Sequence, residues 1–161
     1  MMQNEAIRSR PHIPGYGIPE GSEGMVTWEW VMEQVTAQRN YWICTVTPDN
    51  RPHATPVWGI WLDADFYHGG AAHTRRARNL ATNPHMVMHL ESGDTVVIIE
   101  GTAEYLTETT VDPQLAARLD AEYVKKYAMP HGLPVWRLRP TKAFAWHDYP
   151  TSVTRWVFTT A

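Results

Sequence analysis

The sequence lacks the features that mark several common protein classes. It contains one cysteine, Cys44, so no disulfide can form within the chain, and we expect a reducing, cytoplasmic location. No apolar run approaches the roughly 20 residues that a membrane-spanning helix needs. The first ten residues, MMQNEAIRSR, hold no apolar segment of the kind found in secretion signals. We therefore expect no membrane partner.

An excess of basic residues is also missing. The formal net charge is -3 at pH 7, which weighs against a nucleic-acid partner, because general nucleic-acid binders carry a broad positive surface. Hydrophobic residues make up 43% of the chain and charged residues 19%, a balance typical of globular domains. Aromatic residues are plentiful instead. The eight Trp and seven Tyr can fill a core, line a stacking pocket or cover a subunit interface.

The pattern along the chain predicts an N-terminal arm and one domain. Residues 1–25 include RPHIPGYGIPEGSEG, whose prolines and glycines exclude a regular element, so we interpret them as a flexible or wrapping arm. Residues 26–161 form the domain. Strands are expected at 41–47, 53–62, 66–70, 85–91, 95–107, 135–147 and 154–158, and helices after Thr27, after Thr74 and after Asp112. Short strands broken by turns, with few helices, indicate a mainly β fold, a small antiparallel barrel.

One short stretch concentrates positive charge. In TRRARN, Thr74 is a candidate helix N-cap, and Arg75, Arg76 and Arg78 follow it directly. Cations are disfavoured at a helix N-terminus, because the helix dipole is positive there. A bound phosphate would compensate them, since a guanidinium matches phosphate oxygens with two parallel hydrogen bonds. The alternative is a solvated surface helix whose charges share a sign by chance.

Three segments together carry a resemblance to a known family. They are YWICTVTPDNRPHATPVWGIWLDADFYHGG, TRRARNLATNP and MVMHLESGDTVVIIEGTAE. In their order and spacing they resemble the pyridoxamine 5'-phosphate oxidase-like superfamily, and within it the flavin/deazaflavin-dependent oxidoreductases. The resemblance covers residues 28–158. It implies a split antiparallel β-barrel of the FMN-binding type, and a homodimer that holds its cofactor at the subunit interface.

The resemblance also implies a set of cofactor-binding residues. Thr74 and Arg76 match the family's phosphate-binding Ser/Thr-x-Lys/Arg pair, with Arg75 and Asn79 beside them. The cofactor ring would lie along the second strand and the end of the third, at Thr55, Pro56, Val57, Trp58, Tyr67, Gly69 and Gly70. The glycines would allow the backbone to approach the ligand closely. The region DTVVI lacks the glutamine found there in the name-giving oxidases, which argues against pyridoxamine phosphate as substrate.

The resemblance implies either FMN or the deazaflavin coenzyme F-420, with a slight preference for the deazaflavin. We expect hydride transfer between this ring and a small unsaturated or carbonyl-like substrate. His68, at the end of the third strand, is the candidate catalytic proton donor, and a packing role is its alternative. A non-catalytic flavin-binding or carrier protein is the rival function. No metal site is expected, because His85 and His89 lie on a strand, roughly 13 Å apart.

Overall fold

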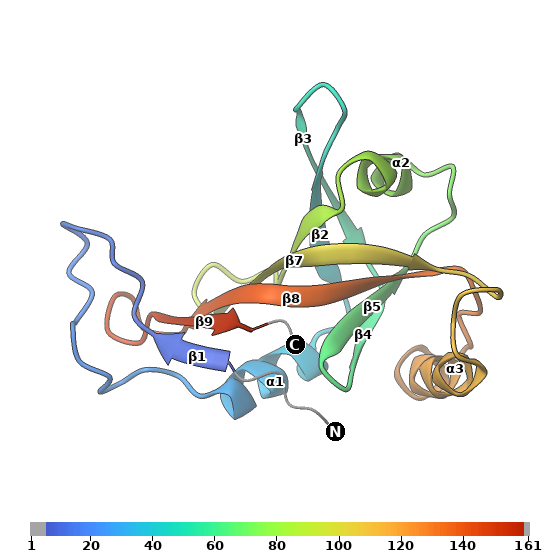
Figure 1. Cartoon of the computed structure of the whole chain (residues 1–161). Coiled ribbons are helices and arrows are strands. Elements are labelled where there is room, and N and C mark those ends of the chain that lie inside the picture. The colour runs from blue at the N-terminus through green and yellow to red at the C-terminus, as the bar shows by residue number, and fades with distance from the viewer. Residues whose placement is uncertain (1–5, 160–161) are drawn as a thin grey trace.

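The computed structural model describes residues 6–159. Within that range nine strands pair antiparallel in one sheet (Figure 1). The strands are β1 (Ala6–Ser9), β2 (Tyr41–Val46), β3 (Pro52–Val57), β4 (Gly59–Leu62), β5 (Asp65–Gly69), β6 (His85–His89), β7 (Val96–Leu106), β8 (Val135–Trp146) and β9 (Thr154–Phe158). The helices are α1 (Trp28–Ala37), α2 (Arg75–Thr82) and α3 (Pro113–Tyr127). The mainly β, split-barrel fold class is therefore confirmed.

The barrel closes where one predicted strand divides its pairing between two neighbours. The sequence predicts a single strand over 53–62, but the structure separates it at Trp58 into β3, which pairs with β2, and β4, which pairs with β5. Because β5 also pairs with β8, the order β2–β6–β7–β8–β5 returns to this bent strand. Gly59 permits the bend. A Cβ there would lie 2.3 Å from Cζ of Phe66.

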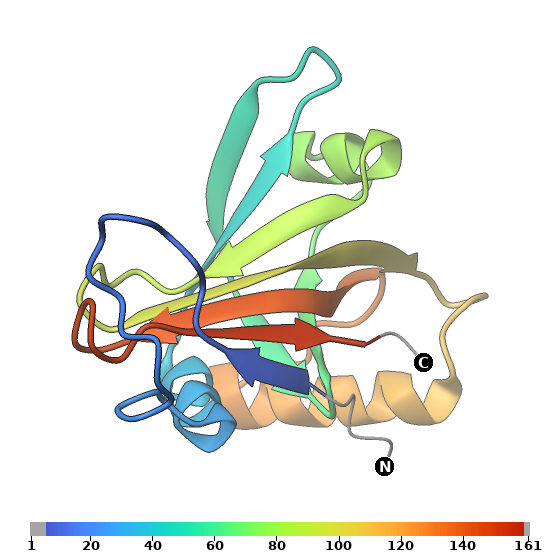
Figure 2. The same ribbon diagram turned by 60° about the vertical axis from the view of Figure 1, so that its left-hand side comes forward.

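Each helix begins at the cap that the sequence indicates. The side chains of Thr27, Thr74 and Asp112 accept a hydrogen bond from the backbone N–H of the first turn of α1, α2 and α3, respectively. Pro113 stands at the start of α3, where its missing N–H costs nothing. Figure 2 shows α1 and α3 along the lower side of the barrel, whereas α2 lies beside the β2–β3 hairpin.

Two hydrophobic clusters stabilise this arrangement. The larger fills the barrel and contains Tyr41, Phe66, Met88, Leu138 and Trp156, each 2% exposed or less. The smaller lies between α3 and the strands and contains Ile60, Tyr67, Leu119, Tyr123 and Tyr127. Burial on this scale contributes roughly 1.5–3 kcal/mol for each large side chain relative to exposure. The smaller cluster sets α3 directly beside the end of β5.

The expectation that residues 1–25 contain no regular element is wrong for residues 6–9. These form β1, which pairs with β9 through Ile7 and Val157. The prolines and glycines that exclude a strand lie only after this point, and an edge of the sheet was available for pairing. Residues 1–5 lie outside the described residues.

Arg10 ties the rest of the arm to the barrel. Its guanidinium donates to the backbone carbonyls of Gly21, Glu23, Thr151 and Val153 over 2.6–3.0 Å. These carbonyls belong to the arm and to the turn that joins β8 to β9. One side chain thus satisfies acceptors in two loops that are distant in sequence.

We expect Arg10→Ala to release the arm without unfolding the barrel. The four carbonyls would return to water, and the contact between the arm and the β8–β9 turn would lose its only guanidinium bonds. Limited proteolysis should then cut residues 11–25 at least several-fold faster, while the midpoint of urea unfolding changes little. Arg8→Ala serves as the control because the Arg8 side chain is exposed. Equal cleavage of Arg10→Ala and the unaltered protein would contradict the clamp.

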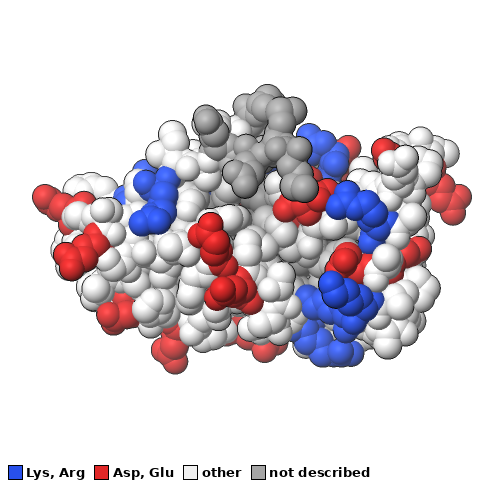
Figure 3. All heavy atoms as spheres, turned by 90° about the horizontal axis from the view of Figure 1, so that it is seen from below, with Lys and Arg blue, Asp and Glu red and all other residues white. Residues whose placement is uncertain are grey.

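The surface bears charges of both signs. Figure 3 shows acidic and basic side chains side by side on the face seen from below, where α1 and α3 lie in Figure 1. One bidentate pair, Arg118 with Asp63, joins α3 to the β4–β5 turn at 2.8–2.9 Å. Within residues 6–159, no helix has the length and apolar character needed to cross a bilayer.

Candidate functional site

The candidate site is centred on the end of β5, at Gly69 and Gly70. A Cβ on Gly69 would lie 1.8 Å from Nε2 of His131, and a Cβ on Gly70 would lie 2.7 Å from Nη2 of Arg76. Gly70 also has a φ of +154°, a conformation that favours glycine. The side chains of His131 and Arg76 thus pack directly against these two residues, which both must be glycine. Their contact with a cofactor stays a prediction.

Arg76 is the inward-facing member of the arginine cluster. Its Nη2 donates to the carbonyl of Gly69 at 2.7 Å. Its Nε is buried and has no hydrogen-bond partner within the described range, and burial lowers the pKa of the guanidinium. Arg75 is exposed, and Arg78 donates to the carbonyl of His73 at 2.7 Å. Arg76 therefore keeps a buried, unused donor.

Thr74 and Asn79 have structural roles in α2. The Thr74 hydroxyl oxygen accepts from the N–H of Ala77 at 3.2 Å and its hydroxyl donates to the carbonyl of Ala71. Asn79 is 2% exposed, and its Nδ2 donates to Oγ1 of Thr45 at 2.9 Å, which fixes α2 to β2. Their contact with a cofactor stays a prediction.

The predicted ring-binding residues of β3 do not share one environment. Thr55 is half-buried and Pro56 is exposed, but the Val57 side chain is 8% exposed and belongs to the core. The Trp58 ring stacks on Tyr127 of α3, with centroids 4.6 Å apart and planes 7° apart. The Trp58 side chain is 39% exposed, and the guanidinium of Arg39 lies 5.1 Å from its ring centroid.

His68 is fully buried inside the barrel, at 0% exposure. Its Nδ1 lies 2.8 Å from the carbonyl of Gly69, and its Nε2 has no partner among the described residues. Burial, with a smaller contribution from the charge of Arg76, lowers the pKa of His68 to about 3. The imidazole is therefore neutral at pH 7, and with Nδ1 donating to Gly69 its Nε2 is an acceptor. Its role as a proton donor stays a prediction.

The burial of His68 predicts a loss of stability in mild acid. An unfolded histidine takes up a proton near pH 6.5, whereas folded His68 stays neutral until about pH 3. Below pH 6.5 the unfolded state binds more protons, so the free energy of unfolding falls as the pH falls, by at most about 1.4 kcal/mol per pH unit. Urea unfolding at pH 7, 6 and 5 should show this slope. It should flatten in His68→Phe and persist in His85→Gln, since His85 is exposed.

Five buried side-chain polar atoms have no hydrogen-bond partner within residues 6–159: Nε2 of His68, Nε of Arg76, the hydroxyl of Tyr123, Nε1 of Trp136 and Nε of Arg137. The Nε of Arg137 lies 4.0 Å from the Asp65 carboxylate, whereas the other four belong to residues at or beside the end of β5. His68 and Trp136 are direct cross-strand neighbours on β5 and β8. Each unsatisfied buried group costs free energy. Their grouping at one place is therefore the strongest structural indication of a site that a ligand completes.

Two further side chains of this site, Tyr123 and His131, carry no motif that points to them. Tyr123 falls on the apolar face of α3, and its ring belongs to the smaller hydrophobic cluster. His131 follows α3 in a loop whose sequence, AMPHGLP, resembles an ordinary turn. Its approach to Gly69 is a tertiary contact over more than 60 residues, and no local pattern announces it.

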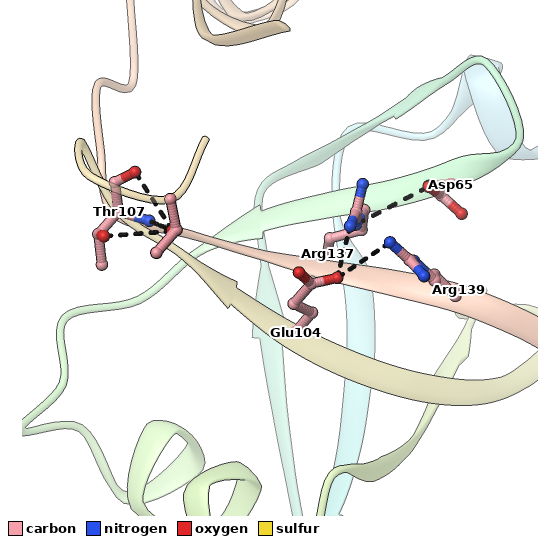
Figure 4. Close-up of polar contacts among 6 residues, drawn as sticks. Asp65, Glu104, Thr107, Arg137 and Arg139 are labelled. Atoms are coloured by element: carbon pink, nitrogen blue, oxygen red, sulfur yellow. Dashed lines mark hydrogen bonds and ion pairs between the residues drawn. The ribbon is translucent and has the colours of Figure 1, made fainter. Parts of the chain in front are cut away.

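A second group of arginines, on β8, is already neutralised. Figure 4 shows Arg137 between Asp65 and Glu104, with Arg139 also reaching Glu104. The Arg137–Glu104 ion pair measures 2.5 Å and the Arg139–Glu104 pair 3.2 Å. Nearby, a cavity of about 290 Å³ is lined by Tyr105, Thr107, Glu108, Thr109, Leu133 and Pro134. Because carboxylates compensate these guanidinium groups, Arg76 is better suited to bind an anion. No cluster of three metal-ligating side chains occurs in the described residues.

Several solved structures share this fold. HutZ, a heme storage protein from Vibrio cholerae, has a TM-score of 0.59 at 16% identity, over 73% of this chain and 92% of its own. An F420 reductase has a TM-score of 0.52 at 19% identity, over 69% and 94%. A pyridoxamine 5'-phosphate oxidase-related, FMN-binding protein from Nostoc punctiforme has a TM-score of 0.59 at 12% identity, over 88% and 94%.

The sequence itself provides the family assignment. No curated protein matches the chain significantly. The sequence profile of the pyridoxamine 5'-phosphate oxidase family matches residues 28–147, a range that includes the whole site from β3 to α3. The chain therefore belongs to the pyridoxamine 5'-phosphate oxidase family.

Proposed function

We propose that this protein binds a phosphorylated flavin-type cofactor at the end of β5 and serves as an oxidoreductase. The observation that carries the proposal concerns Arg76, in the first turn of α2. Its Nε is buried and has no hydrogen-bond partner among the described residues. A phosphate would accept from that donor and would also gain from the free backbone N–H groups of a helix N-terminus. The residues present thus fit a phosphorylated cofactor.

Between the two candidate cofactors, we favour the deazaflavin coenzyme F-420 over FMN. Arg75 and the exposed part of Arg78 extend positive charge along α2 beyond Arg76, which suits a longer anionic tail. An F420 reductase and an FMN-binding protein both share this fold, so the fold accommodates either ring.

The reaction we propose is hydride transfer to a small unsaturated or carbonyl-like substrate. The cofactor ring, when bound, supplies the hydride chemistry. The chain supplies orientation and a low-water environment. Arg76 would hold the phosphate, the exposed part of Trp58 beside Arg39 would lie against a ring, and the buried interior behind His68 would exclude water. A neutral His68 is suited to accept a hydrogen bond at Nε2 rather than to donate a proton from a cation.

We also propose a homodimer that forms through the outer face of the sheet. Cross-strand register places Trp42, His89, Ile98 and Phe144 in one row across β2, β6, β7 and β8, and each is only half-buried. The neighbouring row runs from Val87 through the Glu100–Lys142 ion pair to Val157. A row of half-buried apolar and aromatic side chains beside a charged pair is typical of an interface between subunits. Light scattering at two protein concentrations would test it.

A non-catalytic binding or storage protein is the second candidate. The full burial and neutrality of His68 favour it, because the site then lacks an evident proton donor. HutZ, which shares the fold, is a heme storage protein. Turnover with a reductant and an acceptor distinguishes an enzyme from a carrier, whereas affinity for the cofactor does not.

The first experiment is a fluorescence titration of ligand-free protein with FMN and, separately, with the deazaflavin. Saturable binding of one of them in the micromolar range or tighter is expected, and it would identify the cofactor. Binding of neither would refute the proposed function. A complex that binds but does not turn over any reductant would support the carrier instead.

A further inference from the structure

Tyr123 presents a buried hydroxyl whose proton has no acceptor in the described structure. The side chain is 1% exposed, and its hydroxyl makes no well-formed hydrogen bond within residues 6–159. Burial, and next the charge of Tyr127, raise the pKa of Tyr123, whereas a hydrogen-bonding contact with the Gly69 backbone and the charge of Arg76 lower it. The hydroxyl oxygen can thus accept from Gly69, but its proton remains available to a ligand.

One turn along the same helix, Tyr127 shows how a structural tyrosine is satisfied here. Its hydroxyl accepts from the N–H of Gly59 at 2.9 Å and lies 2.8 Å from the carbonyls of Gly59 and Arg39. Two tyrosines on one face of α3 thus differ in one respect: the hydroxyl proton of Tyr127 has carbonyl acceptors in the fold, and that of Tyr123 has none among the described residues. Phenylalanine at position 123 would make the same apolar contacts without an unsatisfied group.

His131 reaches the same point from the loop after α3. Its Nε2 is the heavy atom nearest to the position that a Cβ on Gly69 would take. Its ring centroid lies 4.9 Å from that of Tyr123. The loop is held in place, because the N–H of Gly132 donates to Oδ1 of Asp120 at 2.8 Å and Nδ1 of His131 lies 3.0 Å from the Gly132 carbonyl. His131 is exposed, so this side of the cluster opens to solvent.

We propose that Arg76, Tyr123 and His131 form one binding site for a phosphate-class oxyanion, with Tyr123 and His131 completing what α2 begins. The three side chains come from α2, α3 and the loop after it, and they meet at the Gly69 peptide. Arg76 and Tyr123 can donate hydrogen bonds, and His131 can donate from Nε2 in its protonated form, because its Nδ1 faces the Gly132 carbonyl. No carboxylate pairs with Arg76 in the part of the chain that the structure describes. This inference rests on the proposed function in one respect only: the natural ligand of the site would be the phosphate of the cofactor.

The test compares Tyr123→Phe with Tyr127→Phe in the full chain. The probes are inorganic phosphate, FMN, and riboflavin, which has the same ring but no phosphate. For Tyr123→Phe we expect an unchanged or higher midpoint of thermal unfolding and about tenfold weaker binding of phosphate and FMN, with riboflavin affinity unchanged. For Tyr127→Phe we expect a lower midpoint and unchanged phosphate affinity. Phosphate binding that Tyr123→Phe leaves intact, or no phosphate binding to the unaltered protein, would overturn the site.

A second measurement follows His131 directly. The imidazole proton resonances of His131, assigned by comparison with His131→Gln, should shift on addition of inorganic phosphate, and those of exposed His85 on β6 should not. A shift confined to other histidines would remove His131 from the site. Phosphate binding without binding of either FMN or the deazaflavin would leave this inference intact while refuting the proposed function. If Tyr123→Phe and Tyr127→Phe bound FMN with equal affinity, the proposed function would stand and the role of Tyr123 would be refuted.

Discussion

Replacement of Arg76 by Ala is expected to weaken binding of the phosphorylated cofactor by about ten- to a hundredfold. A hydrogen bond between charged groups contributes about 1.5–3 kcal/mol, and each 1.4 kcal/mol corresponds to a tenfold change in affinity. The Nε of Arg76 is buried and has no partner in residues 6–159. Because this donor makes no hydrogen bond in the described structure, nearly all the energy of a new hydrogen bond to it would contribute to anion binding. The measurement is the fluorescence titration described for the unaltered protein.

The matched controls for Arg76→Ala lie on the same helix. Arg75→Ala removes an exposed arginine from the preceding position, and its effect should be less than threefold because water screens exposed charge. Arg76→Lys keeps the charge but loses the planar set of donors, so we expect an intermediate loss. Arg76→Ala with normal secondary structure and unchanged affinity would show that the anion binds elsewhere.

The largest expected effect on stability is that of Gly101→Ala. Gly101 lies at the register shift of β7, opposite Pro140 of β8. A Cβ at this position would lie 2.1 Å from the backbone oxygen of Arg139 and 2.7 Å from Cδ1 of Leu138. The first of these atoms belongs to the backbone of the central strand pair and cannot move aside. We expect a loss of about 3 kcal/mol or more in the free energy of unfolding, a large fraction of the total stability of a domain.

Gly93→Ala is the control for this steric argument. No atom lies within 4 Å of a Cβ built on Gly93, in the turn between β6 and β7. The change should alter the free energy of unfolding by less than about 0.5 kcal/mol. Urea unfolding of both variants gives the comparison. Similar stability of the two would mean that β7 and β8 can separate locally without penalty.

Local patterns predicted most elements because their causes are local. Thr27, Thr74 and Asp112 are helix caps in the sequence and in the structure. The β-branched and aromatic residues of 41–47 predict a strand, and the structure has β2 there with alternating buried and half-buried side chains. What the sequence could not show is pairing. Residues 53–62 are predicted as one strand, and only the approach of Phe66 to Gly59 reveals that its two halves join different neighbours.

The site was predicted in part for the same reason. Arg76 and the two glycines were identified from a short motif, and the structure places them in contact. His68 was expected at the end of its strand, where it lies, but its burial depends on β8 and on packing against Phe66. Tyr123 and His131 reach the site through the packing of α3 on β5, which no spacing in the sequence encodes.

The bent strand that closes the barrel also bears on how the protein avoids aggregation. Within the described residues β3 ends the run of paired strands, so one side of it faces outward. Exposed strand edges can recruit strands from other molecules. Two of the six residues of β3, Pro52 and Pro56, have no N–H to offer such a strand. Extension of the sheet into a fibre is thereby obstructed at this end, while the half-buried face of the sheet remains open to a second copy of the chain.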